Sequence, residues 1–194
     1  PEDRERFAAY ALERHIRFVL ADRRPGFLKG AGANLMVDRV LAAIHSALAI
    51  QGEPGMPDIT PELNELRTWF EAILNTSISS DGYPEEDGGY GTGYLTMIFL
   101  AAEALRRAGI MDPLQAAPRL ARAGQMFLHL SPPWGEQFPA TGDCGGSYGI
   151  RQYLLPIFAR RDRDPSLLWL YGHVKDLPEW EVPLDRAGFC VPAD

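Results

Sequence analysis

The chain has 194 residues, of which 46% are hydrophobic and 23% charged, a composition that is ordinary for a globular protein. This length fits one domain with a sizeable core. The formal net charge of -7 argues against a nucleic-acid partner, because a protein that binds nucleic acid presents a basic face to the phosphates. Charged residues interrupt every apolar stretch before the ~20 residues of a membrane span, so no membrane partner is expected.

Apolar residues recur at intervals of three and four along most of the chain, which is the period of amphipathic helices. Asn34 is a suitable cap for the second helix, and Thr60 followed by Pro61 opens the third. The fourth helix begins within or just after the glycine-rich segment 79–93 and ends at Gly109. The other expected helices cover 4–21, 118–130, 150–160 and a short stretch after Pro165.

Helices joined by short links alternate in direction, so successive links fall at alternating ends of the array. The long glycine-rich links then share one end: 23–34, 79–93 and 131–147. The opposite end carries plain turns: 51–60, 109–117 and 161–165. Because functional residues gather on loops held by a rigid scaffold, we expect the site at the glycine-rich end.

These elements predict an all-α fold built of antiparallel helical hairpins. The expected helical domain covers residues 1–174, and the proline-containing stretch 175–194 is expected to be irregular or linker-like. No pattern of alternating strand residues interrupts the helices.

The segment from Asp81 to Tyr94 combines carboxylates and tyrosines with five glycines. Glycine lets a ligand approach the backbone closely, and tyrosines supply stacking surfaces and hydroxyls for sugars or proton transfer. A tight, solvated connection with tyrosines packed on helix ends is the alternative interpretation of the same residues.

The sequence Glu-Asp-Gly-Gly-Tyr at 86–90, followed by Gly-Tyr at 93–94 and an apolar helix, resembles the toroid domain of heparinase II/III-type polysaccharide lyases. The segment 30–34 is similar to a Gly-Ala-Asn element of chondroitin and hyaluronan lyases, and 142–143 to a Gly-Asp element of heparinase-like chains. The resemblance implies an incomplete (α/α) toroid, a uronate-containing polysaccharide or oligosaccharide as partner, no cofactor, and a periplasmic or secreted location.

The resemblance also implies roles for individual residues in a β-elimination. Asn34 would neutralise the uronate carboxylate, and Tyr90 would act as acid or base, with His129 as a further candidate at the end of its helix. A tyrosine needs nearby positive charge to act as a base near neutral pH, because its unperturbed pKa is ~10. The expected substrate-binding residues are Tyr83, Glu86, Asp87, Tyr94, Trp134, Asp143, Tyr148 and Arg151.

Two features of the chain depart from this family. Family members usually place a histidine beside the asparagine, but Leu35 follows Asn34, and His45 lies ~16 Å further along its helix, where a packing role is expected. The lyases also have a complete toroid with β-sandwich domains, so further domains of a longer chain are expected as partners.

Two other functions explain the same residues. In a glycoside hydrolase, Glu86 or Asp87 would act with Asp143 as general acid and base, about 5–10 Å apart across a sugar. In a carbohydrate-binding or scaffold fragment without catalysis, the stacking platforms would be Tyr83, Tyr90, Trp134 and Tyr148.

The acidic residues and cysteines indicate no metal site. The carboxylates of the tyrosine-rich segment fit no calcium-loop spacing and are expected to form a solvated acidic edge. Cys144 and Cys190 cannot build a four-ligand zinc site by themselves. Two buried free thiols are expected, and a single disulfide between them is the alternative.

Overall fold

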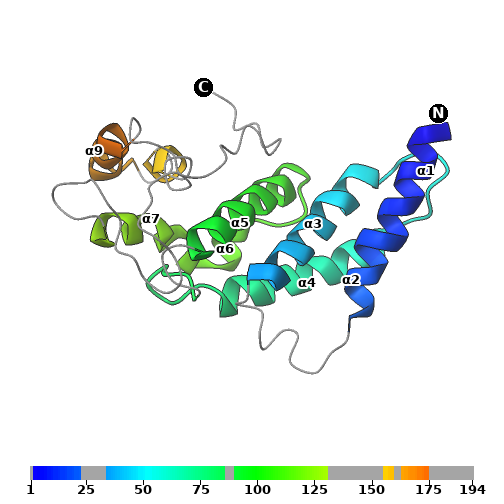
Figure 1. Ribbon diagram of the computed structural model, residues 1–194, viewed down its shortest axis with the longest axis horizontal. Coiled ribbons are helices and arrows are strands. Elements are labelled where there is room, and N and C mark those ends of the chain that lie inside the picture. Colours follow the sequence, from blue (N-terminus) through cyan, green and yellow to red (C-terminus); the bar gives the residue numbers. More distant parts are fainter. Residues whose placement is uncertain (1, 23–33, 86–89, 131–154, 160–162, 175–194) are drawn as a thin grey trace. The chain divides into compact units, whose positions relative to one another are not determined.

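The computed structural model describes residues 2–22, 34–85, 90–130, 155–159 and 163–174 (Figure 1). Most of these residues are helical, and the rest form turns and a single β-bridge, so the predicted all-α class is confirmed for the described part of the chain. Residues 155–159 form one helical segment. The other elements are α1 (Glu2–Tyr10), η1 (Ala11–Arg17), α2 (Phe18–Ala21), α3 (Asn34–Ile50), α4 (Thr60–Thr76), α5 (Tyr90–Arg107), α6 (Pro113–Ala116), α7 (Pro118–Leu130) and α9 (Pro165–Val174).

Local sequence signals account for the ends of several helices. The Asp58 carboxylate accepts hydrogen bonds from the Thr60 N–H at 3.0 Å and the Thr60 hydroxyl at 2.6 Å, so Asp58, one residue before the N-cap Ile59, binds the first residue of α4. At the end of α5, Gly109 has φ +68° and the Ile110 N–H donates to the Leu105 carbonyl at 3.0 Å, a turn that favours glycine. The link 109–117, expected to be a plain turn, contains the short helix α6.

The chain divides into two compact units. The first comprises Pro1–Ile78 and Met97–Pro118, and the second Ser79–Thr96 and Arg119–Asp194. Residues 90–96 of α5 therefore belong to the second unit and residues 97–107 to the first.

In the first unit, η1 packs against α3, and α3 packs against α4 (Figure 1). Fully buried apolar residues from all three elements form this core, among them Ile16, Leu41, Ile44, Leu66 and Phe70. Their spacing of three and four places them on one face of each helix, which is why the sequence period predicts the core. The wider turn of η1 lies inside a helix that the sequence predicts as continuous over 4–21.

Polar contacts join the first helix to its neighbours. Arg17 of η1 donates from Nε to Glu62 of α4 at 3.1 Å. It also donates from Nη1 to Glu13 of η1 itself at 2.6 Å. His15 Nδ1 lies 3.1 Å from the Ser46 hydroxyl of α3. These contacts are at the surface, where an ion pair stabilises a protein by about 0–1 kcal/mol, so the apolar core dominates the stability of this unit.

In the second unit, α7 is the element on which other segments pack. Phe127 of α7 and Phe158 have ring centroids 5.8 Å apart, and both side chains are buried. Gln125 of α7 donates to the Asp164 carboxylate at 2.9 Å, and the other oxygen of Asp164 accepts the Ser166 N–H at 2.8 Å and so caps α9. None of the described helices is both long and apolar enough to cross a bilayer.

Candidate functional site

Residues 79–85, which include the start of the tyrosine-rich segment at Asp81, rest directly on α7. A Cβ added to Gly82 would lie 2.5 Å from the main-chain nitrogen of Ala123 and 2.5 Å from the carbonyl carbon of Arg122. Gly82 also has φ +85°, a conformation that favours glycine. Arg122 Nη1 donates to the Ser80 carbonyl at 3.1 Å, so a side chain of α7 also binds the loop.

Hydrogen bonds within the loop fix its turn. The Ser79 N–H donates to the Tyr83 carbonyl at 2.8 Å, and the Tyr83 N–H donates to the Ser79 hydroxyl at 3.0 Å. The Gly82 N–H donates to the Ser79 carbonyl at 3.0 Å. Tyr83 itself is half-buried, so part of this side chain remains accessible at the loop surface.

Sequence reasoning overlooked two residues that position this loop, Ser79 and Arg122. A serine shortly before Asp-Gly is a turn signal and points to Ser79. No local signal points to Arg122, because it lies 42 residues from its partner Ser80.

His129 is exposed in the last turn of α7. It follows Arg122 by seven residues, so it lies about 10 Å along the helix axis from the point where the loop docks. The second unit therefore contains both Tyr83 and His129, on a loop and a helix that are attached to each other.

Three other candidate site residues lie at or near the start of a helix. Tyr90 is the first residue of α5 and Tyr94 follows one turn later, and both belong to the second unit. Asn34, expected as the cap of this helix, is the first residue of α3 and belongs to the first unit. The side chains of these three residues lie outside the described part of the structure.

The remaining predictions fall on residues that the structure does not describe. They concern the expected binding residues Glu86, Asp87, Trp134, Asp143, Tyr148 and Arg151. The same holds for Cys144, Cys190 and the segment 175–194. Among the described residues, no three His, Cys, Asp or Glu side chains are grouped so as to hold a metal ion.

His45 is half-buried in α3, and its Nε2 atom is buried without a hydrogen-bond partner. Burial lowers the pKa of His45, because the charged imidazolium loses solvation. This half-buried position in α3 agrees with the packing role expected from the sequence.

The link between α3 and α4, expected to be a plain turn, lines an open surface hollow of about 460 Å³. Its lining includes Glu53, Met56, Asp58 and Ile59. Glu53 forms an ion pair with Arg4, and Asp58 accepts hydrogen bonds from Thr60, so structural contacts already occupy both carboxylates. The acidic residues that line the hollow are therefore explained by their structural contacts, without a ligand.

The described residues define an all-α protein in which the loop 79–85, with Tyr83, is anchored on a helix by a glycine and an arginine. No known protein family, curated protein or solved structure matches the chain.

Proposed function

We propose that this chain is a polysaccharide-lyase-type domain, an incomplete (α/α) toroid that cleaves a uronate-containing polysaccharide by β-elimination at its tyrosine-rich loop. The observation that supports this proposal is the attachment of residues 79–85 to α7 through Gly82 and Arg122. The same helix presents His129 in its last turn, so the loop and a candidate acid or base share one scaffold.

In the proposed reaction, a base removes the proton at C5 of the uronate, beside the carboxylate. The C5–H electron pair forms the C4–C5 double bond as the C4–O bond breaks, and the leaving oxygen takes up a proton. In the lyases that the chain resembles, an asparagine neutralises the carboxylate and makes the C5 proton easier to remove, and the resemblance gives this role to Asn34. Tyr90 and His129 are the proposed proton carriers, since tyrosine and histidine are both suited to general acid–base catalysis.

An anchored loop suits this role because substrate-positioning groups act best when the scaffold holds them rigidly. Hydrogen bonds to Ser79 fix the backbone of Tyr83, while its side chain stays partly accessible. A tyrosine ring in that position offers a face on which a sugar can stack.

The first experiment measures ultraviolet absorbance of unsaturated uronate while the chain is incubated with a panel of uronate polysaccharides. We expect absorbance to rise with the unmodified chain and the rate to fall by at least about 100-fold in Tyr90→Phe and His129→Ala, the usual contribution of general acid–base catalysis. Tyr171→Phe and His173→Ala are matched controls, because these residues lie on α9 of the same unit. Both controls should retain the full rate.

A second candidate function is carbohydrate binding without catalysis. It is favoured by Tyr83, which is partly accessible on a loop that Arg122 holds on α7. If absorbance stays flat, titration calorimetry with the same polysaccharides tests binding, with Tyr83→Ala as the variant expected to weaken it. Release of reducing ends without absorbance would instead indicate a glycoside hydrolase and overturn the lyase proposal.

A further inference from the structure

The first helix of the chain, formed by α1, η1 and α2, has apolar residues on two faces. One face is buried and contributes Ala8, Ala11, Leu12, Ile16, Val19 and Leu20 to the core. Outside this face, Phe7 is 62% exposed, Tyr10 57% and Phe18 63%. Large exposed aromatic side chains gathered on one element are typical of an interaction surface.

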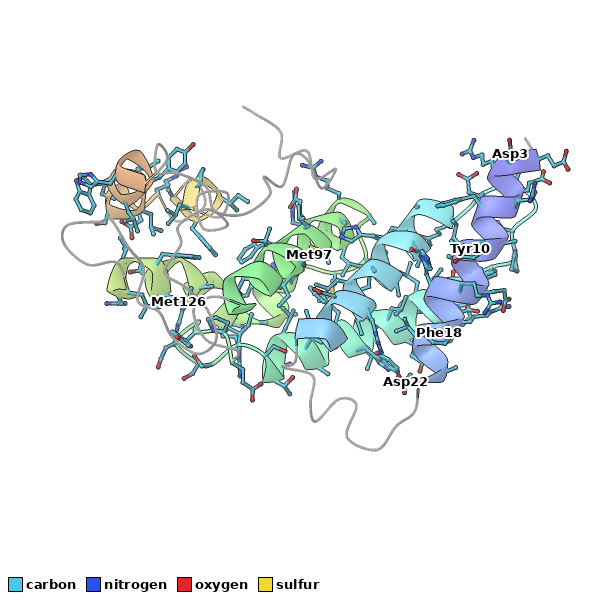
Figure 2. The ribbon with its side chains drawn as sticks, in the orientation of Figure 1. Asp3, Tyr10, Phe18, Asp22, Met97 and Met126 are labelled. Carbon is cyan, nitrogen blue, oxygen red and sulfur yellow. The ribbon has the colours of Figure 1, made fainter. Side chains whose placement is uncertain are left out.

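Four exposed residues of this helix form a line, which we call the N-terminal stripe: Asp3, Phe7, Tyr10 and Arg14. The spacings of four and three place Asp3, Phe7 and Tyr10 on one side of α1, and Arg14 follows four residues later in η1, where four residues make almost one wider turn. Asp3 and Tyr10 mark two positions along this line in Figure 2. The stripe therefore runs from an acid through two aromatic rings to a base.

The two charges at the ends of the stripe are not used within the described residues. Asp3 and Arg14 form no ion pair there, whereas Arg4 pairs with Glu53 and Arg17 pairs with Glu62. Because the stripe has an acid at one end and a base at the other, its charges are complementary to those of a second copy of the stripe that runs in the opposite direction.

We propose that the N-terminal stripe is the surface through which two copies of this chain pair, with their first helices antiparallel about a twofold axis between residues 8 and 9. Asp3 of each copy then lies opposite Arg14 of the second copy, and Phe7 lies opposite Tyr10. A twofold interface uses the same patch on both subunits, so each contact occurs twice. The two aromatic pairs lie near the axis and the two ion pairs at the rim.

The charge order of the helix favours a second copy over other occupants. A nucleic acid or an anionic membrane surface attracts a face of one positive sign. The first turn of α1 instead carries Glu2, Asp3 and Glu5, which would repel such a surface. A parallel helix pair would place Asp3 beside Asp3 and Arg14 beside Arg14, so the antiparallel arrangement is the complementary one.

The expected dimer is weak. One pair of helices buries less than the roughly 1,200 Å² of total surface found in standard stable interfaces. We therefore expect a dissociation constant on the order of 10 µM or higher, so dimers form in the upper part of an ordinary concentration series. Phe18 lies beyond the paired residues and does not contribute to this contact.

Sedimentation equilibrium of the full chain from about 1 µM to about 500 µM tests the proposal. The average mass should rise from 21.5 kDa toward twice that value. Asp3→Arg alone and Arg14→Asp alone each bring like charges together twice and should weaken association by about tenfold or more. Glu5→Arg is the matched control, because it changes the net charge as Asp3→Arg does but lies on another side of the helix.

One double variant and one mixture make the result specific to the antiparallel register. Combining Asp3→Arg with Arg14→Asp in one chain should restore the dimer. Mixing the two single variants should produce heterodimers, because each mixed pair again places acids opposite bases. A monomeric mass over the whole series, or a dimer that all the charge reversals leave unchanged, would overturn the proposal. Circular dichroism confirms that each variant retains its helix.

Discussion

The main chain of Gly82 approaches α7 so closely that a Cβ there would lie 2.5 Å from the carbonyl carbon of Arg122. Real side chains do not tolerate such a distance, and the backbone of a helix cannot easily move away. This relationship attaches the tyrosine-rich loop to the helix that carries His129. The stability of the second unit and the function proposed for it therefore depend on the same contact.

Gly82→Ala should lower the free energy of unfolding of the second unit by about 2–4 kcal/mol. About 1 kcal/mol comes from placing alanine at positive φ, and the rest from the clash with α7. Urea unfolding followed by circular dichroism measures the loss.

Gly55→Ala is the matched control for that substitution. Gly55 has φ +81°, almost the same as Gly82, but a Cβ there would meet nothing within 4 Å. It should cost only the conformational part, about 1 kcal/mol. Equal losses in the two variants would show that the contact with α7 adds nothing.

Gly124→Ala should destabilise the second unit by about 1–2 kcal/mol through overpacking. A Cβ at Gly124 would lie 3.0 Å from Cβ and Cγ of the buried Phe158 side chain. Combined with Phe158→Leu, the same substitution should cost less, because the smaller side chain leaves room. A double-mutant cycle measures this coupling, and strictly additive losses would contradict the packing argument.

The stabilising contribution of Glu103 should disappear in acid. Hydrogen bonds from Arg106, at 2.8 Å, and Arg107, at 2.7 Å, lower the pKa of Glu103 from its ordinary 4.5 to about 2. A lowered carboxyl pKa stabilises the folded state above pH 4.5, and this stabilisation is lost as the pH falls toward 2. Because 42% of the side chain is exposed, solvent screening should limit it to less than about 1 kcal/mol.

Comparison of the unmodified chain with Glu103→Gln at pH 6 and pH 2.5 measures this effect. The difference in unfolding free energy should be present at pH 6 and shrink at pH 2.5. It should also shrink in high salt, which screens surface charges. A difference that is constant with pH would mean that the arginines do not favour the ionised carboxylate.

Removing the ionisable group of His45 should stabilise the fold below neutral pH. Burial lowers the pKa of His45 below its ordinary 6.5, so the unfolded chain binds a proton more readily than the folded one. The folded state is therefore favoured above pH 6.5 and loses stability as the pH falls. His45→Leu should have a higher free energy of unfolding than the unmodified chain, and this difference should grow as the pH falls from 7.5 to 5. Urea unfolding measures the difference. A difference that is constant with pH would contradict the effect of burial.

Much of the helical framework was predictable because helix signals are local. Pro118 begins α7, and Thr60 with Pro61 begins α4, as the sequence indicates. The three-and-four spacing of apolar residues identified Leu66 and Phe70 as core residues, since that period reflects the geometry of one helix. The wide turn in η1 and the short helix α6 carry no comparable signal and were missed.

The sequence by itself determined an all-α chain, the ends of most of its helices and the buried side of α4, because these depend on neighbours within a few residues. Only the tertiary structure decided that Gly82 rests on α7 and that Arg122 holds Ser80. It also decided that Phe7 and Tyr10 stay exposed while Ile16 is buried. The physical reason is that close approach and burial depend on segments far apart in the chain, which a local pattern does not specify.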